Sequence, residues 1–372
     1  MSAHSTDRKI RVAVLFGGRS GEHPISCATA AGVLRAIDRE RYDVLPIGIT
    51  PQGRWVLVAD DPDALALTGG DLPHVPETGG DVVVVMDGEG GELVVTEPGT
   101  VPAALGDVDV VLPLLHGPFG EDGTLQGLLE MAGLPYVGSG VLASAVGMDK
   151  HYMKVVLAGH GLPVGPYTVI PPRLWRTDRA AALDAVAGLG LPVFVKPARG
   201  GSSLGISRVD RVEDLEAAVA AAQEHDPKVI VEAALPGREI ECAVLQGRGD
   251  DAPRTALPGE IVVTEHAFYD FESKYLDGDH VRLRCPADLS EETSDRVRRL
   301  AAEAFDALGC EGLARVDFFV DGTTVTINEV NTMPGFTPFS MYPLMWERTG
   351  VAYPDLVDEL VQLALARPTG LR

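Results

Sequence analysis

The chain has 372 residues, of which 45% are hydrophobic and 23% charged, a composition typical of a globular protein with two or three domains. Its formal net charge of −23 disfavours binding to nucleic acid or to an anionic membrane. No apolar run approaches the roughly 20 residues of a membrane-spanning helix, and the polar stretch 1–9 lacks the apolar core of a secretory signal. The four cysteines are far apart and include no Cys-x-x-Cys pair, which indicates neither a zinc site nor a disulfide framework. A reducing, cytoplasmic compartment is therefore expected.

The N-terminal region predicts the start of a parallel sheet. The apolar stretch Ile10–Phe16 is predicted as a strand, and a glycine-rich turn leads from it into apolar residues at helical spacing from Ile25 to Ile37. A second strand, Tyr42–Ile49, completes a βαβ unit. The buried-type strand Asp109–Leu115 is expected in the same sheet, and residues 51–106 are expected to insert a hairpin formed by Val82–Met86 and Leu93–Thr96. The first domain is predicted to cover residues 1–138.

The middle of the chain is predicted to form a second domain over residues 139–235, with mixed helices and strands. The expected elements are a helix at Ser144–Gly159, strands at Pro192–Lys196, Ile206–Val209 and Val229–Glu232, and a helix at Val212–Ala222. A glycine-rich loop, Arg199–Gly205, joins the first two of these strands.

Residues 236–372 are predicted to form the third domain. It opens with the strand Glu239–Leu245, which is followed by a polar loop, Thr264–Leu283. A helix is then expected to begin after Ser290 as its N-cap and to end before Gly309.

A hairpin near the carboxyl end carries the most informative pattern. Its predicted strands are Ala314–Val320 and a stretch from Val325 that Met333-Pro334-Gly335 ends, on either side of an Asp-Gly turn. Alternate side chains of a strand share a face, so Glu329 and Asn331 point the same way and Asp317 can lie across from them. Two carboxylates and an amide oxygen on one face are suited to Mg²⁺. Arg315 joins this face, and a cation site beside a guanidinium suits phosphoryl chemistry. The competing interpretation, a solvated polar face, fits poorly because both strands are otherwise apolar.

Two further patterns point to phosphate binding. The loop Arg199–Gly205 has strands on both sides, unlike a Walker loop, and its glycines can direct bare N–H groups at phosphate oxygens. Lys196 lies in the strand that leads into this loop and needs an anionic partner, although an ordinary hairpin with a surface lysine remains the alternative. Lys150 supplies a second lysine, although an exposed lysine on a helix is the alternative. Glu232 and Glu239 are strand-end carboxylates that can accept from adenine and ribose.

The turn after the first strand lacks the Gly-x-Gly-x-x-Gly spacing of a dinucleotide site. We expect instead that Glu22 stands at a helix N-terminus, where it can bind the ammonium group of a substrate. His116 follows a buried strand, at the end where open α/β sheets bind ligands. A structural histidine is the equally weighted alternative.

Five motifs in this order resemble the ATP-grasp superfamily and, within it, the D-alanine–D-alanine ligase family. The resemblance runs from about Ile10 to Leu363. The motifs are GGRSGEHPIS, LHGPFGEDGTLQG, VKPARGGSSLG, FYDFESKY, and ARVDFF with NEVNTMPGFT. The resemblance implies three domains around a cleft, with an N-terminal parallel-sheet domain and ATP held between the other two. This α/β and α+β ATP-grasp fold is the predicted fold class.

The resemblance also implies the residues of the nucleotide site. The ATP-binding residues would be Lys150, Lys196, Ser203, Glu232, Glu239, Lys274 and Phe319. Two Mg²⁺ (or Mn²⁺) ions would be bound by Asp317, Glu329 and Asn331. Ala233 and Ala234 depart from the bulkier residues that often face adenine in the family.

The substrate site is implied in the same way. Glu22 would bind the ammonium group of the first D-alanine, with Ser202 and Tyr275 as its hydrogen-bonding partners. Arg315 and the Gly335 N–H would stabilise an oxyanion, while Ser340 and Met341 would contact the carboxylate of the second D-alanine. Ile25, in place of the usual valine, and His116 complete the set of expected substrate contacts.

The implied activity is ATP-dependent ligation of two D-alanine molecules through an acyl phosphate, for peptidoglycan precursors, by a cytoplasmic homodimer. The intact Lys274-Tyr275 pair favours D-alanine over D-lactate as the second substrate. A depsipeptide ligase or another carboxylate–amine ligase of the superfamily is the alternative. A nucleotide-binding regulatory protein is disfavoured because it would need no oxyanion group, and a nicotinamide oxidoreductase because the dinucleotide fingerprint is absent.

Overall fold

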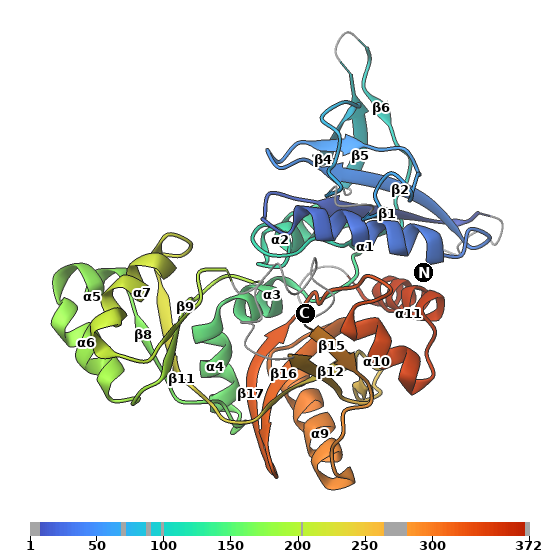
Figure 1. Ribbon diagram of the computed structural model, residues 1–372. Coiled ribbons are helices and arrows are strands. Elements are labelled where there is room, and N and C mark those ends of the chain that lie inside the picture. The colour runs from blue at the N-terminus through green and yellow to red at the C-terminus, as the bar shows by residue number, and fades with distance from the viewer. Residues whose placement is uncertain are drawn as a thin grey trace.

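The structure is a computed structural model that describes residues 8–67, 72–86, 91–97, 100–201, 204–263 and 281–368. Three sheets form three lobes, with helices packed against each of them (Figure 1). No helix within these ranges is both long and apolar enough to cross a membrane.

The N-terminal lobe contains a seven-stranded sheet in the order β6-β5-β4-β3-β2-β1-β7. Strand β1 (Ile10–Gly17) is parallel to both β2 (Tyr42–Ile49) and β7 (Val110–Pro113), and helix α1 (His23–Ala36) connects β1 to β2, which confirms the predicted βαβ unit. The remaining strands of the sheet pair in antiparallel fashion. They are β3 (Trp55–Leu57), β4 (Asp81–Met86), β5 (Gly91–Thr96) and β6 (Ala103–Ala104). The pairing of β4 with β5 confirms the expected hairpin, and α2 (Thr124–Met131) follows β7.

The second lobe contains an antiparallel four-stranded sheet in the order β10-β9-β11-β8. Its strands are β8 (Tyr167–Ile170), β9 (Val193–Pro197), β10 (Ser207–Val209) and β11 (Val229–Ala233). One core joins the sheet to its helices, which are α5 (Pro172–Thr177), α6 (Arg179–Ala187) and α7 (Leu215–Gln223), the last preceded by a 3-10 turn at Val212–Asp214. Strand β8 and helices α5 and α6 are absent from the elements expected from the sequence.

Strand β9 separates the two faces of this second sheet. Val193 and Val195 are fully buried in the core shared with the helices. Because side chains alternate along a strand, Phe194 and Lys196 point to the opposite face. On β11, Glu232 pairs in register with Phe194, and Ile230 pairs with Lys196. The face opposite the helices therefore carries the charged pair Lys196 and Glu232.

The third lobe contains a six-stranded sheet in the order β15-β14-β12-β16-β17, with β13 paired to β12. Its strands are β12 (Arg238–Leu245), β13 (Arg254–Thr255), β14 (Gly259–Val263), β15 (Val281–Arg284), β16 (Leu313–Asp321) and β17 (Thr324–Asn331). Helix α9 (Glu291–Ala307) packs on β12 and β16, and the Ser290 Oγ accepts a hydrogen bond from the Thr293 N–H at 3.2 Å, which confirms the predicted N-cap. Helices α10 (Met341–Thr349) and α11 (Tyr353–Ala366) complete the chain.

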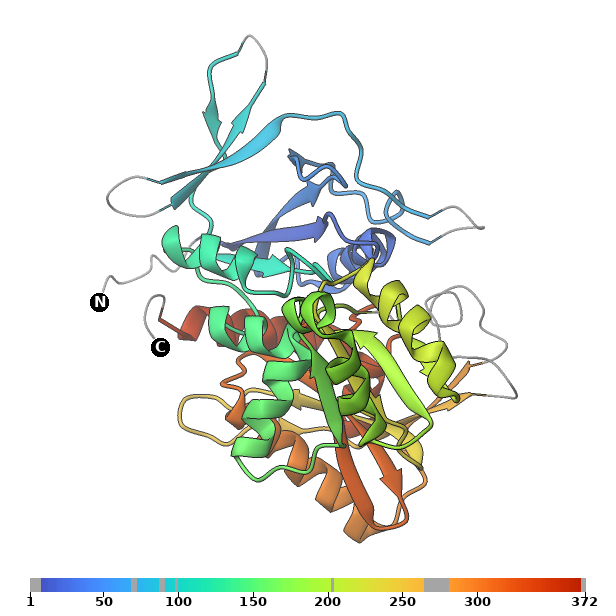
Figure 2. The same ribbon diagram turned by 90° about the vertical axis from the view of Figure 1, so that its left-hand side faces the viewer.

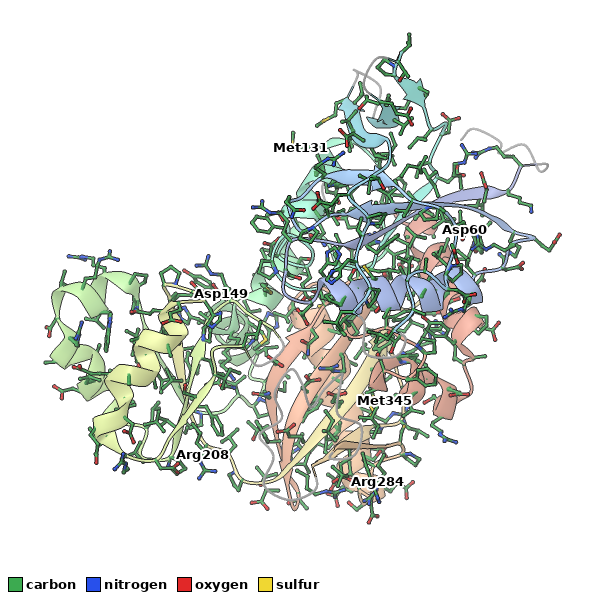
Figure 3. The ribbon with its side chains drawn as sticks, turned by 45° about the horizontal axis from the view of Figure 1, so that its top comes forward. Asp60, Met131, Asp149, Arg208, Arg284 and Met345 are labelled. Atoms are coloured by element: carbon green, nitrogen blue, oxygen red, sulfur yellow. The ribbon has the colours of Figure 1, made fainter. Side chains whose placement is uncertain are left out.

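The predicted helix Ser144–Gly159 is wrong as one continuous element, because it forms two helices. Helix α3 (Val141–Met148) ends at Asp149, and α4 (Lys150–Gly159) begins immediately after it. Asp149 has extended backbone angles and its carboxylate accepts from the backbone N–H groups of His151 and Tyr152, so it acts as an N-cap. Figure 3 shows Asp149 near the place where the second lobe meets the rest of the molecule.

Two shared cores join segments that are far apart in the sequence. Met153 and Leu157 of α4 are fully buried in the core that also contains α9 and the apolar face of β16 and β17. Another core unites β1, β7 and α1 with α10 and α11, so that α11 lies against the N-terminal lobe (Figure 2). The division into domains 1–138, 139–235 and 236–372 stays a prediction.

Candidate active site

The hairpin β16–β17 brings its predicted polar residues together on one face. Arg315 lies opposite Asn331 in the register, and Asp317 lies opposite Glu329. The Arg315 Nε and Nη2 donate to the two carboxylate oxygens of Asp317, each at 2.7 Å, and the Asn331 Nδ2 donates to Asp317 at 2.9 Å. The Asp317 side chain is only 13% exposed. This is therefore not an ordinary solvated face.

Glu241 supports Arg315 from the neighbouring strand β12, where it pairs with Asp317 in the register. Its Oε1 lies 3.3 Å from the Arg315 Nη2, and the residue is 4% exposed. Sequence reasoning missed Glu241, although it lies two residues after Glu239 in the same strand and therefore shares its face.

A β-bulge interrupts the pairing of β16 with β17. The register shifts between Asp317 and Phe318, which leaves Asn328 as the extra residue. The backbone carbonyl of Asn328 accepts a hydrogen bond from the Lys154 Nζ at 3.1 Å. Strand alternation alone does not predict this bulge, which sets the direction of Glu329.

The donor set of this face fits a hard divalent cation. Carboxylates of Asp317 and Glu329 and the amide oxygen of Asn331 are ligands that Mg²⁺ accepts. Within the described ranges, no group of three or more His, Cys, Asp or Glu side chains could hold a metal ion, so a cation here would also need the amide oxygen. In the observed arrangement the nitrogen of that amide faces Asp317, and rotation of the amide would exchange nitrogen for oxygen.

Lys150, the first residue of α4, points into the same region. Its Nζ lies 3.1 Å from the Glu329 carboxylate and donates to the Gly200 carbonyl at 2.9 Å. Burial alone would lower the pKa of Lys150, but the Glu329 carboxylate, together with Glu232 and Glu121, outweighs it and the net shift is upward. The lysine is therefore positively charged beside the glycine-rich loop.

A second charged cluster lies on the inner face of the four-stranded sheet. The Lys196 Nζ is 2.6 Å from one Glu232 oxygen, and the Lys154 Nζ is 3.0 Å from the other. Burial would raise the pKa of Glu232, but the two lysines together lower it to about 2. The partner of Lys196 is thus a carboxylate of the chain itself. Glu239 is exposed at the start of β12, where it pairs in register with Phe319.

Sequence reasoning missed Lys154, although it is 2% exposed and stands between two lobes. Its only signal is the four-residue spacing from Lys150, which places both lysines on one face of a helix. A lysine at such a spacing usually lies at the surface, so the pattern does not reveal its burial.

The N-terminal lobe contributes the N-terminal end of α1 and the turn after β7. Glu22 is the N-cap residue of α1, which confirms its predicted place at a helix N-terminus. The Ser20 Oγ donates to the His116 carbonyl at 2.7 Å and so ties the two turns together. Burial lowers the pKa of His116, whose Nδ1 lies 3.2 Å from the Met333 carbonyl oxygen. Its buried Nε2 has no hydrogen-bond partner among the described residues.

Glu121 is a further carboxylate that sequence reasoning did not single out, although the GEDG motif contains it. It accepts a hydrogen bond from the Gly117 N–H at 2.7 Å. Burial, and then the neighbouring charge of Glu22, raise the pKa of Glu121 to about 8. The site therefore holds a carboxyl group that is largely neutral at pH 7.

These elements line a common cleft between the lobes. Its polar lining residues are Glu22, His116, Glu121, Lys150, Arg315, Glu329, Asn331 and Thr332, with backbone from Gly200, Gly201 and Gly335. Ile25 and Met341, by contrast, are only 2% and 5% exposed, and Met341 packs against Gly259. Any substrate contact from Met341 would have to come from its backbone at the start of α10.

Ser340 lies close to this cleft, immediately before α10. Its Oγ accepts from the Thr337 N–H at 3.1 Å and faces Gly335, where an added Cβ would lie 3.3 Å away. Four predicted site residues lie outside the described ranges. These are Ser202, Ser203, Lys274 and Tyr275.

Comparisons with known proteins agree with this architecture. Residues 11–139 match the family "D-ala D-ala ligase N-terminus", and residues 156–362 match "D-ala D-ala ligase C-terminus". The D-alanine–D-alanine ligase of Kineococcus radiotolerans is 62% identical over 99% of this chain and 100% of its own length. That of an Arthrobacter species is 60% identical over 98% and 96%.

Solved structures give the same result at lower identity. The D-alanine–D-alanine ligase from Coxiella burnetii is 35% identical, with a TM-score of 0.80, and the match covers 96% of this chain and 94% of that one. The VanG D-Ala:D-Ser ligase from Enterococcus faecalis is 34% identical, with a TM-score of 0.82 over 96% and 100%. These matches confirm the predicted ATP-grasp fold class. With both family regions matched and full-length relatives at about 60% identity, this chain belongs to the D-alanine–D-alanine ligase family.

Proposed function

We propose that this protein joins two D-alanine molecules into D-alanyl-D-alanine at the expense of ATP, for peptidoglycan precursor synthesis. The observation that carries the proposal is the convergence of Glu22, Lys150, Arg315 and Glu329 in one cleft, from the N-terminal lobe, helix α4 and the hairpin β16–β17. Relatives at about 60% identity over nearly the whole chain are named D-alanine–D-alanine ligases, which supports the same activity.

ATP would lie between the second and third lobes. Lys150 and Lys196, with Ser203 and Lys274, would bind its phosphates, because cationic groups neutralise the charge of a transferring phosphoryl group. The adenosine would be bound by Glu232, Glu239 and Phe319. Asp317, Glu329 and Asn331 would hold two Mg²⁺ (or Mn²⁺) ions, which would polarise the phosphate oxygens.

The chemistry proceeds in two steps. A carboxylate oxygen of the first D-alanine attacks the γ-phosphorus of ATP, so that an acyl phosphate forms and ADP leaves. The neutral amine of the second D-alanine then attacks the acyl carbon, and the tetrahedral intermediate expels inorganic phosphate. Arg315 and the Gly335 N–H would stabilise the oxyanion of that intermediate.

The remaining predicted residues would orient the substrates. Glu22 would bind the ammonium group of the first D-alanine, supported by Ser202 and Tyr275, with Ile25 and His116 beside it. Ser340 and Met341 would bind the carboxylate of the second D-alanine. The proton of its ammonium group would leave towards Ser202 or Tyr275, and the loop that contains Tyr275 would exclude water from the acyl phosphate.

The preference for D-alanine as second substrate rests on sequence rather than on fold. A D-Ala:D-Ser ligase is as similar to this chain in structure as a D-alanine–D-alanine ligase is. Relatives at about 60% identity are named D-alanine–D-alanine ligases, which favours D-alanine as the second substrate. We further propose that the protein is a cytoplasmic homodimer with domains at 1–138, 139–235 and 236–372.

The decisive experiment is a phosphate-release assay on purified protein with ATP and Mg²⁺. We expect release with D-alanine alone, formation of D-alanyl-D-alanine, and loss of both when Mg²⁺ is removed with a chelator. Parallel reactions contain D-alanine with D-lactate or D-serine, across a range of pH. A mixed product that exceeds D-alanyl-D-alanine at neutral pH would replace the proposal by a depsipeptide or D-Ala:D-Ser ligase.

A further inference from the structure

Lys154 is a buried cation for which the proposed chemistry has no use. It lies one helical turn after Lys150 on α4, and its side chain is 3% exposed. Unlike Lys150, it does not line the cleft. Because burying an ammonium group is costly, a buried lysine persists only where fixed partners compensate for the lost water.

The partners of Lys154 come from two different sheets. Its Nζ lies 3.0 Å from the Glu232 Oε1 on β11, in the four-stranded sheet. The same Nζ donates to the Asn328 carbonyl at 3.1 Å on β17, in the six-stranded sheet. Helix α4 itself is anchored to the third lobe, since Met153 and Leu157 are fully buried in its core. Lys154 therefore reaches from the third lobe to the second.

Both partners of Lys154 belong to the expected nucleotide site. One lies next to an expected metal ligand in the sequence, and the other is itself an expected adenine contact. Asn328 is the bulged residue that immediately precedes Glu329, the expected metal ligand. Glu232 is an expected adenine contact, and Lys196 holds its other oxygen at 2.6 Å. Each oxygen of Glu232 is thus bound by one lysine and retains a second lone pair for a ligand.

We propose that Lys154 is a positioning residue for nucleotide binding. It fixes Glu232 of the second lobe relative to the bulge at Asn328 in the third, so that the adenosine end and the phosphate end of the nucleotide site keep their separation. This inference rests on the proposed function, because it requires that ATP bind between these two lobes. Lys154 does not contact the reacting atoms.

The test compares Lys154→Met with Lys154→Arg in the full-length protein. Lys154→Met keeps the apolar stem but removes the charge, and we expect the KM for ATP and the Kd for ADP to rise about tenfold or more. The KM for D-alanine should change less than twofold. Lys154→Arg retains a cation with several donors and should recover most of the nucleotide affinity. Lys154→Gln, which retains a neutral donor, is measured alongside.

Arg367→Met is the matched control. Arg367 is also buried, with a side chain 8% exposed, and it is ion-paired to Glu311 at 3.3 Å. It donates to the carbonyls of Tyr136 and Gly138, in the segment between α2 and α3, and contacts neither of the two partners of Lys154. This variant should lower the melting temperature without changing the Kd for ADP.

A double-mutant cycle with Glu232→Gln makes the test specific. If Lys154 acts through Glu232, adding Lys154→Met to Glu232→Gln should weaken ADP binding much less than it does in the wild type. Lys154→Met variants that are destabilised but bind ADP as the wild type does would overturn the proposal, as would equal losses of affinity for ATP and D-alanine.

ADP binding is measured without turnover. A wild type that binds ADP but makes no D-alanyl-D-alanine would therefore refute the proposed function and leave the role of Lys154 open to the same measurement.

Discussion

Two charged clusters lie one helical turn apart along α4, and they differ in how far they are exposed to solvent. The front cluster consists of Lys150, Arg315, Asp317, Glu329 and Asn331, and four of its five members line the cleft. The rear cluster consists of Lys154, Lys196 and Glu232, and none of its members lines it. The Glu329 side chain is 27% exposed, against 10% for Glu232.

This difference indicates two roles for ion pairs in one site. In the front cluster, every charge except that of Asp317 lines the cleft, so an incoming phosphate or metal ion can replace its present partner. In the rear cluster, the charges satisfy one another away from water, and removing Glu232 would leave two buried lysines without an anion. The front cluster is suited to exchange partners with a ligand, whereas in the rear cluster the pair of Lys154 with Glu232 is suited to stay fixed while the nucleotide binds.

The strongest test of the rear cluster is Glu232→Gln. Removing this carboxylate leaves Lys154 and Lys196 facing each other without an anion, and we expect a loss of about 3–5 kcal/mol in the free energy of unfolding. Urea denaturation at pH 7 measures the change. Glu260→Gln is the control, because its partners Arg238 and Arg284 have side chains 40% and 54% exposed and remain solvated. An equal loss of free energy of unfolding in both variants would show that burial of the rear cluster adds nothing to the cost of removing its carboxylate.

The corresponding test of the front cluster is Arg315→Ala. If Arg315 stabilises the oxyanion, kcat should fall by roughly 10²–10³-fold. The free energy of unfolding should fall as well, because Asp317, which is 13% exposed, and the buried Glu241 lose their shared cation. Steady-state kinetics and urea denaturation are measured on the same samples, with the exposed Arg208→Ala as control. Unchanged kcat would remove Arg315 from the chemistry.

Glu121 provides a pH test at the edge of the front cluster. Its pKa of about 8 in the folded state lies above the value of about 4.3 expected when unfolded. A group with a raised folded pKa stabilises fully below the unfolded pKa, and that stabilisation is lost as the pH rises through the folded pKa. Between about pH 5 and 9, the wild type should therefore lose about 2 kcal/mol or more relative to Glu121→Gln. The free energies of unfolding are measured by urea denaturation at each pH. A constant difference between the wild type and Glu121→Gln over this range would contradict the raised pKa of Glu121.

Ser290→Ala is expected to have the smallest effect of the four variants and shows what a small loss of stability does to activity. Ser290→Ala removes the N-cap of α9, far from both clusters, and should cost about 1 kcal/mol of stability. Neither kcat nor the affinity for nucleotide should change. A kinetic effect of this variant would mean that stability losses of this size disturb the cleft indirectly.

The sequence predicted the front cluster better than the rear one, for a physical reason. Strand alternation and an Asp-Gly turn are local, so they placed Arg315, Asp317, Glu329 and Asn331 on one face. The bulge at Asn328 follows from how the strands are paired, which no local pattern encodes. The predicted βαβ unit, the β4–β5 hairpin and the Ser290 cap depended on the same kind of local rule.

Lys154 and Glu121 were missed because their importance comes from burial. A lysine on a helix and an acid in a polar turn look like surface residues until tertiary packing encloses them. Asp149 was overlooked as a helix boundary because the apolar spacing continues through it from α3 into α4. In each case, contacts between distant segments decided the outcome.

The packing of α11 against α1 and β7 also bears on how the protein is made. Residues 353–366 emerge from the ribosome after all three sheets, yet they cover apolar surface of the N-terminal lobe. That surface must stay exposed to solvent or to a chaperone until these residues have been made. Premature termination before Tyr353 would therefore leave a finished N-terminal sheet with an uncovered, aggregation-prone underside.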